Sequence, residues 1–292
     1  MDFNLTEEHI MVQEAARDFA QNELLPGVIE RDNKQEFPDE LVKKMGALGF
    51  MGIMVDPKYG GSGMDTISYV IIMEELSKID ASASVIVSVN NSLVCYGLET
   101  YGNEAQKQKY LTKLATGEFV GAFCLSEPEA GSDATSQATT AEDKGDHYLI
   151  NGTKNWITSG GRADVYLVIA QTDSAKGHKG INAFIVEKGA PGFHIGPKED
   201  KLGIRGSDTH TLQFNDVKVS KENRIGEDGF GFKFAMKTLS GGRIGIAAQA
   251  LGLASGAYEL SLKYAKQRKA FGTEICNHQA IAFKLADMYT DI

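Results

Sequence analysis

The chain has 292 residues, of which 42% are hydrophobic and 24% charged, a composition typical of a globular protein with a large core. Its formal net charge of -9 argues against nucleic acid as a partner, because phosphate binding needs clustered Lys and Arg. Three scattered cysteines and six scattered histidines form no CxxC or HExxH pattern, so we expect reduced thiols and no metal site.

The start of the chain and its apolar runs argue against export and membrane insertion. The sequence MDFNLTEEH is acidic and polar, unlike a signal peptide or an Arg-rich transit peptide. No stretch approaches the roughly 18 continuous apolar residues that a membrane span needs. We therefore expect a cytoplasmic protein without membrane insertion.

Residues 1–117 are predicted to form an all-helical N-terminal domain. Thr6 can cap a first helix, whose first turn carries Glu7 and Glu8 at the positive end of the helix dipole. This helix is expected to end before Pro26. The apolar face predicted for it comprises Ile10, Val12, Ala15, Ala16, Phe19 and Leu24.

Further helices are predicted in the same domain. Phe37-Pro38 opens one, with Leu41, Met45 and Leu48 on one side. Residues 66–79 are strongly apolar and predict a buried helix. Another runs from Ser82 to about Tyr101 with Gly102 as its C-terminal cap, and Asn103 then caps the next.

Residues 118–228 are predicted to form a middle domain, an antiparallel β barrel or sandwich. Short β-type runs alternate there with Gly, Asp, Asn and Ser turns. Asn151-Gly152 predicts a hairpin between HYLI and TKNWIT, because both residues tolerate positive φ. The other strands are expected at 165–170, 181–187 and 209–219.

Residues 229–292 are predicted to form a C-terminal helical bundle. The long helical pattern after Gly231, which runs to Phe271, carries small residues on one face, as bundles do. The final run AFKLADMYTDI is still periodic at Ile292, with no Gly or Pro stop. We therefore expect this third domain to be truncated.

Two phrases carry a family resemblance when they are taken together. FCLSEPEAGSDA, residues 123–134, is followed by NGTKNWIT, residues 151–158. In this order within a β-rich segment they resemble the flavin-binding signature of the acyl-CoA dehydrogenase family. SVNNSL, EDKLGIRGS, GRIGIAAQALG and FKLADM match in register and favour its short-chain, butyryl-CoA branch. The resemblance covers the whole chain and implies that family's fold, an α+β multidomain arrangement of helices, β domain and helical bundle.

The resemblance implies FAD as cofactor and assigns residues to it. Backbone groups at Leu125 and the Ser126 hydroxyl would bond the pyrimidine edge, and Thr158 would bond near N5 or O4. Read without the resemblance, Phe123 and Leu125 are equally well strand core, Trp156 a core residue and Ser132 a turn residue. The cofactor-binding residues implied within one chain are Phe123, Cys124, Leu125, Ser126, Gly131, Ser132, Trp156, Ile157 and Thr158.

Other residues are implied to bind the substrate or a neighbouring subunit's cofactor. Ser132, Ser240 and Arg243 would meet the coenzyme A part of an acyl-CoA, with Ser240 standing where the family usually has Asp. Arg268, Phe271 and Gln279 would reach the FAD of a neighbouring subunit, although taken alone Arg268 and Gln279 read as solvated helix surface. A cross-subunit role implies a homotetramer, built as a dimer of dimers.

The implied reaction is α,β-dehydrogenation of a short-chain acyl-CoA to the trans-2-enoyl-CoA, with electrons passed to an electron-transferring flavoprotein. The branch keeps its catalytic base, a Glu, in an IYEGT-type motif that this chain lacks, so we expect it beyond Ile292. Some relatives place the base where this chain has Gly242. No catalytic residue is therefore assigned within the chain.

Two other functions remain open at this point. An acyl-CoA oxidase-like flavoenzyme, or a monooxygenase, would let O2 reach the reduced flavin. A non-catalytic flavin-binding remnant would account for the missing base.

Overall fold

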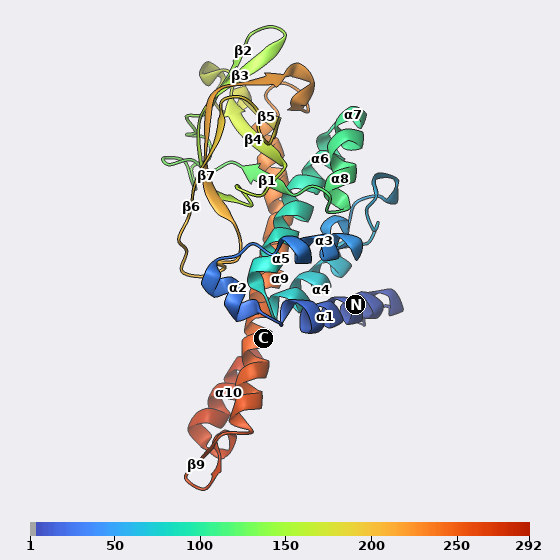
Figure 1. Ribbon diagram of the computed structural model, residues 1–292, viewed down its shortest axis with the longest axis vertical. Helices are drawn as coiled ribbons and strands as arrows, with labels where there is room; N and C mark the ends of the chain where they lie inside the picture. Colours follow the sequence, from blue (N-terminus) through green and yellow to red (C-terminus); the bar gives the residue numbers. More distant parts are fainter. Residues whose placement is uncertain (1–3) are drawn as a thin grey trace.

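Helices, a β sheet and further helices follow one another along the chain. The computed structural model describes residues 4–292. In Figure 1 the N-terminal helices lie below and beside the sheet, and the long helix α9 passes both before it projects beyond them. The sheet and the C-terminal end of α9 therefore lie at opposite ends of the molecule.

The N-terminal domain is helical, as predicted, and its caps form locally. Thr6 caps α1, its hydroxyl accepting from the His9 N–H at 3.2 Å. The Asn103 side chain caps α7 in the same way, at 2.9 Å from the Gln106 N–H. Gly102 ends α6 in an extended rather than a left-handed conformation. The α-helices are α1 Glu7–Phe19, α2 Val28–Lys34, α3 Asp39–Ala47, α4 Thr66–Ser77, α5 Ala81–Ser88, α6 Tyr96–Tyr101, α7 Glu104–Gln106 and α8 Thr112–Ala115, with π-helical turns at Ala20–Leu24, Val89–Cys95 and Lys107–Leu111.

The predicted apolar faces were too broad. Val12, Ala16 and Phe19 of α1 enter the core as predicted. Ile10 and Ala15 lie outside it, and so does Leu48 after α3. Isolated apolar residues on a surface are normal, because helical spacing does not fix the width of the buried stripe.

The π-helical turn at Val89–Cys95 joins the helical domain to the first strand. Asn90 is fully buried, and its amide donates to the carbonyls of Met51 at 2.8 Å and Leu114 at 3.0 Å. Its carbonyl oxygen accepts from the Gly121 N–H at 3.1 Å. One side chain therefore satisfies backbone groups from three separate segments.

One continuous helical stretch in residues 4–292, Ala81–Tyr101, is long and apolar enough to cross a membrane by length and composition. Its apolar residues are interrupted by polar ones such as Ser84, Asn90 and Asn91, so it is not a continuous apolar run. Of its most apolar part, 78% is buried inside the protein, as in a core helix.

The middle domain is a largely antiparallel sheet. In residues 4–292 its eight strands follow the order β6-β7-β3-β2-β4-β5-β8, and β1 pairs parallel with β4. One face packs against the helical domain and α9: Leu167 and Ile185 of the sheet lie in the same core cluster as Phe234 of α9. The strands are β1 Gly121–Cys124, β2 Thr140–Asp143, β3 His147–Thr158, β4 Val165–Gln171, β5 Ile181–Glu187, β6 Phe193–Lys198, β7 Thr209–Ser220 and β8 Arg224–Ile225.

The predicted hairpin at Asn151-Gly152 was wrong, because both residues lie inside the single strand β3. The Asn151 side chain instead bonds Asp216 in a bulge of β7, at 2.9 Å. Gly152 passes so close to Thr139 that a Cβ would stand 2.5 Å from its hydroxyl oxygen. The turn that starts β3 lies earlier, where the Lys144 N–H donates to the His147 carbonyl at 2.9 Å and Gly145 takes φ +92°.

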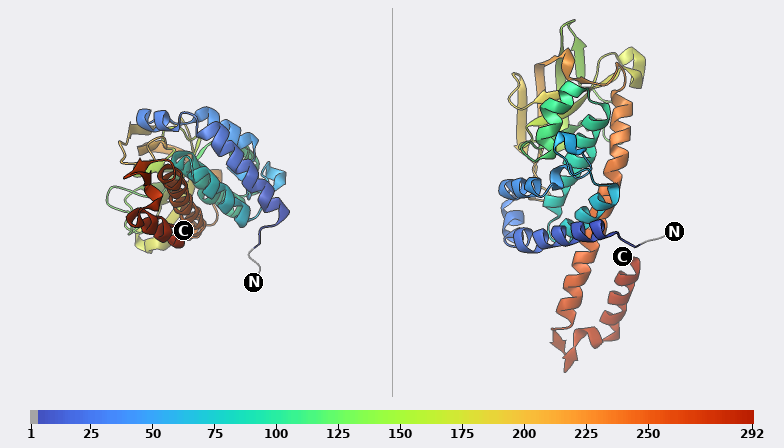
Figure 2. Two further views of the ribbon diagram at one scale, coloured as in Figure 1. Left: turned by 90° about the horizontal axis from the view of Figure 1, so that it is seen from below. Right: turned by 90° about the vertical axis from the view of Figure 1, so that its right-hand side faces the viewer.

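The C-terminal segment consists of α9 Gly231–Ala265, a small ribbon of β9 Lys269–Ala270 and β10 Thr273–Glu274, and α10 Gln279–Asp291. The predicted helix was too long at its C-terminal end, since the pattern up to Phe271 continues past the last helical residue, Ala265. Glycines on one face of α9 let it lie closely on α4 and α5. Figure 2 shows α10 running back along the projecting end of α9.

Candidate functional site

A bulge in β3 presents Trp156, the chain's single tryptophan, to the outside of the sheet. Between Lys154 and Ile157 the pairing with β7 slips by one residue, so Asn155 and Trp156 together face Thr211. Trp156 has φ +61°, a left-handed conformation that is unfavourable for a bulky residue, and its side chain is 63% exposed. Trp156 is therefore not a core residue, and its backbone conformation carries strain typical of functional sites.

The turn after Thr158 is fixed by Asp208. Ser159 is also left-handed, and its N–H donates to the Asp208 carbonyl at 2.6 Å. The Asp208 carboxylate accepts from the Gly161 N–H at 2.6 Å and lies 2.8 Å from His210 Nε2. Sequence reasoning assigned no role to Asp208, although its contacts hold the end of β3 that carries Thr158.

The FCLSEPEAGSDA segment forms the end of β1 and the loop that follows it. Phe123 is buried and stacks on Phe234, with ring centroids 6.2 Å apart. Cys124 is buried too, and burial raises the pKa of its thiol. Leu125 and Ser126 are half-buried, where the chain turns out of the sheet.

Within the loop, Gly131 and Ser132 are exposed, and a Cβ on Gly131 would meet no atom within 4 Å. Space beside Gly131 is therefore open toward solvent. Just before β2 and just after β3, two buried hydroxyl oxygens, those of Thr139 and Ser159, lack a hydrogen-bond partner within residues 4–292. Buried polar atoms of this kind are costly unless another group satisfies them.

Beneath this loop lies a buried ion pair between Lys154 of β3 and Glu127. Lys154 Nζ lies 2.6 Å from Glu127 Oε1 and also donates to the Leu125 carbonyl at 3.0 Å. The Glu127 carboxylate accepts from the N–H groups of Ala138 at 2.5 Å and Thr139 at 3.2 Å. Sequence reasoning missed this pair, because both residues lie within the two motif phrases but nothing in their spacing pairs them.

Electrostatics keep Glu127 ionised. Burial alone would raise the pKa of its carboxyl group, but the Lys154 charge and the hydrogen bonds from Lys154, Thr139 and Ala138 outweigh burial and hold that pKa below its usual range. Burial also lowers the pKa of Lys154, against the opposing attraction of Glu127. Glu127 is thus ionised, and its carboxylate is bonded to Lys154, Ala138 and Thr139.

The residues predicted to meet the substrate lie on α9. Ser240 is exposed, and its hydroxyl donates to the Met236 carbonyl at 3.0 Å. Arg243, three residues further on, is exposed as well. Gly242 faces inward, where a Cβ would stand 2.9 Å from Leu93 Cδ2.

Arg268, Phe271 and Gln279 are not brought together with the residues of β1 and β3. They lie around the β9–β10 ribbon, at the end of the molecule opposite the sheet (Figure 1). Phe271 is 99% exposed with φ +52°, and Arg268 and Gln279 are exposed too. The 35 residues of α9 span about 50 Å, which separates the two groups within one chain.

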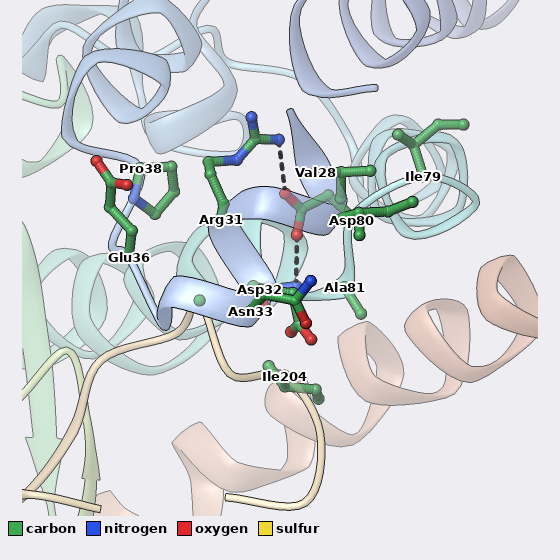
Figure 3. Close-up of a pocket in the computed structure, with 13 residues that line it drawn as sticks. Val28, Arg31, Asp32, Asn33, Glu36, Pro38, Ile79, Asp80, Ala81 and Ile204 are labelled. Atoms are coloured by element: carbon green, nitrogen blue, oxygen red, sulfur yellow. Dashed lines mark hydrogen bonds and ion pairs between the residues drawn. The ribbon is translucent and has the colours of Figure 1, made fainter. Parts of the chain in front are cut away.

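A cavity of about 330 Å³ lies elsewhere, between α2, the start of α5 and the loop before β7 (Figure 3). Arg31 reaches Asp80 across it at 3.1 Å and also donates to the Pro26 carbonyl at 2.7 Å. Asp80 in turn caps α5 through the Ser82 N–H at 2.9 Å. None of the predicted cofactor or substrate residues lines this cavity, and its charged groups serve to hold α2 on α5.

Comparison with known proteins decides the family. Three family models match consecutive parts of the chain: the acyl-CoA dehydrogenase N-terminal domain over residues 6–118, the middle domain over 122–217 and the C-terminal domain over 229–292. The chain belongs to the acyl-CoA dehydrogenase family. The predicted family and its fold are thereby confirmed.

Individual acyl-CoA dehydrogenases match over nearly the whole chain. A short-chain specific acyl-CoA dehydrogenase of Clostridium acetobutylicum is 52% identical over 288 residues, covering 99% of this chain and 76% of that protein. The structure of butyryl-CoA dehydrogenase from Megasphaera elsdenii superposes with a TM-score of 0.96 at 49% identity, covering 99% of this chain and 77% of that one. A chain in a structure of the electron transferring flavoprotein of Acidaminococcus fermentans reaches a TM-score of 0.98 at 51% identity, over 99% of this chain and 76% of that chain.

Proposed function

We propose that this protein is an FAD-dependent dehydrogenase that converts a short-chain acyl-CoA to the trans-2-enoyl-CoA and passes electrons to an electron-transferring flavoprotein. The observation that carries this proposal is the exposed, left-handed Trp156 within a motif shared with the family. Relatives of about 50% identity are named as short-chain or butyryl-CoA enzymes, which supports the substrate class.

The residues of the β domain fit the flavin. Trp156 offers an aromatic face, Gly131 leaves open space, and the hydroxyls of Thr139 and Ser159, unpartnered within residues 4–292, flank β2 and β3. Covering an exposed indole with a planar ligand is favourable, because apolar surface is removed from water. We assign Phe123, Cys124, Leu125, Ser126, Gly131, Ser132, Trp156, Ile157 and Thr158 to the cofactor, with the buried Cys124 and Ile157 contributing through backbone and packing.

Each part of this cradle has a separate task. Bound FAD supplies the two-electron oxidant. Backbone N–H groups and the Ser126 hydroxyl would stabilise negative charge at the pyrimidine edge, because such dipoles are already oriented before the reaction. Trp156 would exclude water from one side of the ring, and Thr158 would orient the flavin through its hydroxyl.

Substrate binding is assigned to Ser132, Ser240 and Arg243. Arg243 is an exposed guanidinium beside Gly242, and its planar fork suits the phosphates of coenzyme A. Removal of the α proton is not assigned to a residue of this chain. Gly242 has no side chain for it, and Glu127 is engaged by Lys154.

The separation of Trp156 from Arg268 supports a shared site between subunits. In an assembly, Arg268, Phe271 and Gln279 of one chain would complete the cofactor site of its neighbour, as the family resemblance implies. We therefore propose a homotetramer, a dimer of dimers, located in the cytoplasm. The division into domains at 1–117, 118–228 and 229–292 is part of this proposal.

An anaerobic titration tests the function. The protein, expressed from its whole reading frame, should bind FAD and lose its oxidised-flavin absorbance when butyryl-CoA is added. Adding electron-transferring flavoprotein should restore the colour faster than air does. Absence of bound flavin would contradict the proposal, whereas rapid peroxide formation in air would favour an oxidase.

A further inference from the structure

We propose that the buried Lys154–Glu127 ion pair is the positioning element of the flavin cradle, setting the direction in which the 125–126 peptide and the following loop face the cofactor. This inference rests on the proposed function, since the cradle is one for flavin. Neither residue would touch the cofactor itself. Both act through the backbone groups that they hold.

The first step concerns the peptide between Leu125 and Ser126. Lys154 Nζ holds the Leu125 carbonyl at 3.0 Å from inside the domain. A trans peptide is planar, so its N–H points away from its carbonyl. Pulling the Leu125 carbonyl inward therefore aims the Ser126 N–H outward. The next carbonyl, that of Ser126, accepts from the Asn155 N–H at 2.8 Å, which fixes the same turn a second time.

The second step concerns the loop with Gly131 and Ser132. Glu127 stands at its start, and its carboxylate accepts from Ala138 and Thr139 at its end. One side chain thus closes both ends of the loop. Gln137 adds a further contact, because its side-chain amide oxygen accepts from Lys154 Nζ at 3.3 Å. The loop itself can be exposed and still have a fixed shape.

The third step concerns Trp156. Lys154 is fully buried and Trp156 is largely exposed, although they are two residues apart on one strand, where alternation would place them on the same face. The bulge after Lys154 breaks this alternation, so the two side chains point to different sides of the strand. Lys154 therefore anchors the strand just before the bulge, and three segments assigned to the cofactor converge on one ion pair.

The burial of this pair argues for positioning rather than stability. The two side chains are 0% and 4% exposed, the most buried of the ion pairs found in residues 4–292. A buried ion pair adds little net stability compared with packed apolar residues, because both charges lose their hydration. What it does provide is a fixed geometry for every group bonded to it.

Two variants test the proposal, E127Q and K154M, each close in size to the native side chain. The matched control is E75Q, because Glu75 is a buried carboxylate that pairs with Arg17 and Lys78 in the helical domain, away from the cradle. For each variant we would measure the melting temperature of the apoprotein, the FAD dissociation constant, and the visible circular dichroism of bound flavin.

We expect E127Q and K154M to weaken FAD binding about ten- to a hundredfold and to change the flavin dichroism. E75Q should lower the melting temperature while leaving the dissociation constant and the dichroism unchanged. If E127Q matches E75Q in melting temperature and also leaves both flavin readouts unchanged, the pair is merely structural and the proposal is wrong.

A measurement on the unmodified protein guards against variants that do not fold. Hydrogen exchange of the Ala138 and Thr139 amides in the apoprotein should already be slow, because Glu127 holds them without the cofactor. Fast exchange that slows only when FAD binds would overturn the proposal. A failure of the function itself gives a different result, since the unmodified protein would then not bind FAD at all.

Discussion

Gly245 of α9 lies directly against the side chain of Tyr69 on α4. A Cβ at Gly245 would overlap the Tyr69 hydroxyl oxygen and stand 2.7 Å from Ser88 Oγ. Tyr69 and Ser88 are bonded to each other at 3.1 Å, so neither can move aside freely. The close approach of α9 to the helical domain therefore depends on the missing side chain.

We expect G245A to lower the free energy of unfolding by about 1–3 kcal/mol, because the extra methyl group overpacks the helix contact. Y69F should recover part of this loss in the double variant, since it removes the nearest atom. Urea unfolding measures both effects. G241A is the control on the same helix, because a Cβ there has its nearest neighbour, the Ser92 carbonyl, at 3.7 Å. Equal losses for G245A and G241A would rule out the packing explanation.

Replacing Trp156 should separate stability from cofactor binding. W156G removes an exposed side chain from a left-handed backbone position that glycine adopts readily, so we expect the apoprotein's free energy of unfolding to change by less than about 1 kcal/mol. FAD affinity should fall by roughly ten- to a hundredfold, because the aromatic surface that covers the ring is lost. Fluorescence titration with FAD and urea unfolding provide the two numbers, and W156F should retain most of the affinity. A large loss of stability with normal FAD binding would mean that Trp156 serves the fold.

The proposed sharing of the cofactor site can be tested with mixed subunits. W156A and R268A should each bind FAD poorly as pure proteins, and Arg268 is exposed, so its loss should not disturb the chain. When the two variants are mixed and reassembled, some sites combine an intact Trp156 with the neighbour's intact Arg268. FAD binding should then recover in part, as flavin absorbance after gel filtration would record. No recovery in confirmed mixed assemblies would place both residues in one chain's site.

Acid stability should depend on Glu75. Burial alone would raise the pKa of this carboxyl group, but Arg17 and Lys78 outweigh burial and lower its pKa below the ordinary 4.5. A lowered pKa in the folded state means that the stabilisation is complete at pH values above 4.5 and is lost as the pH falls through the folded value. The difference in free energy of unfolding between the native protein and E75Q should therefore be constant near neutral pH and shrink in acid. A difference that stays constant down to acid unfolding would show that the ion pair contributes nothing.

Local signals in the sequence predicted the local structure well. The caps at Thr6 and Asn103 are correct because each depends on a side chain that bonds backbone three residues away. The order of helices, strands and helices is correct because hydrophobic period distinguishes them. The prediction of a hairpin at Asn151-Gly152 was wrong because the conformation of these residues depends on contacts with Asp216 and Thr139, which lie outside the predicted hairpin.

The candidate site was predicted in part for the same reason. Family resemblance singled out Trp156, and its exposure follows from a bulge that no residue pattern in the strand reveals. Lys154 received no role, because a lysine between polar neighbours reads as surface and its burial depends on a carboxylate 27 residues earlier. Pairings of this kind emerge only when the segments are placed in space.

Asn90 has a consequence for how the protein unfolds. Its side chain bonds Met51, Leu114 and Gly121, so moving β1 off the helical domain would leave the buried Gly121 N–H and the Asn90 side-chain oxygen without partners. The helical domain and the sheet should therefore lose structure in a single cooperative transition. Calorimetry and circular dichroism would then report the same midpoint for helix and strand, even though the chain looks, element by element, like separate folding units.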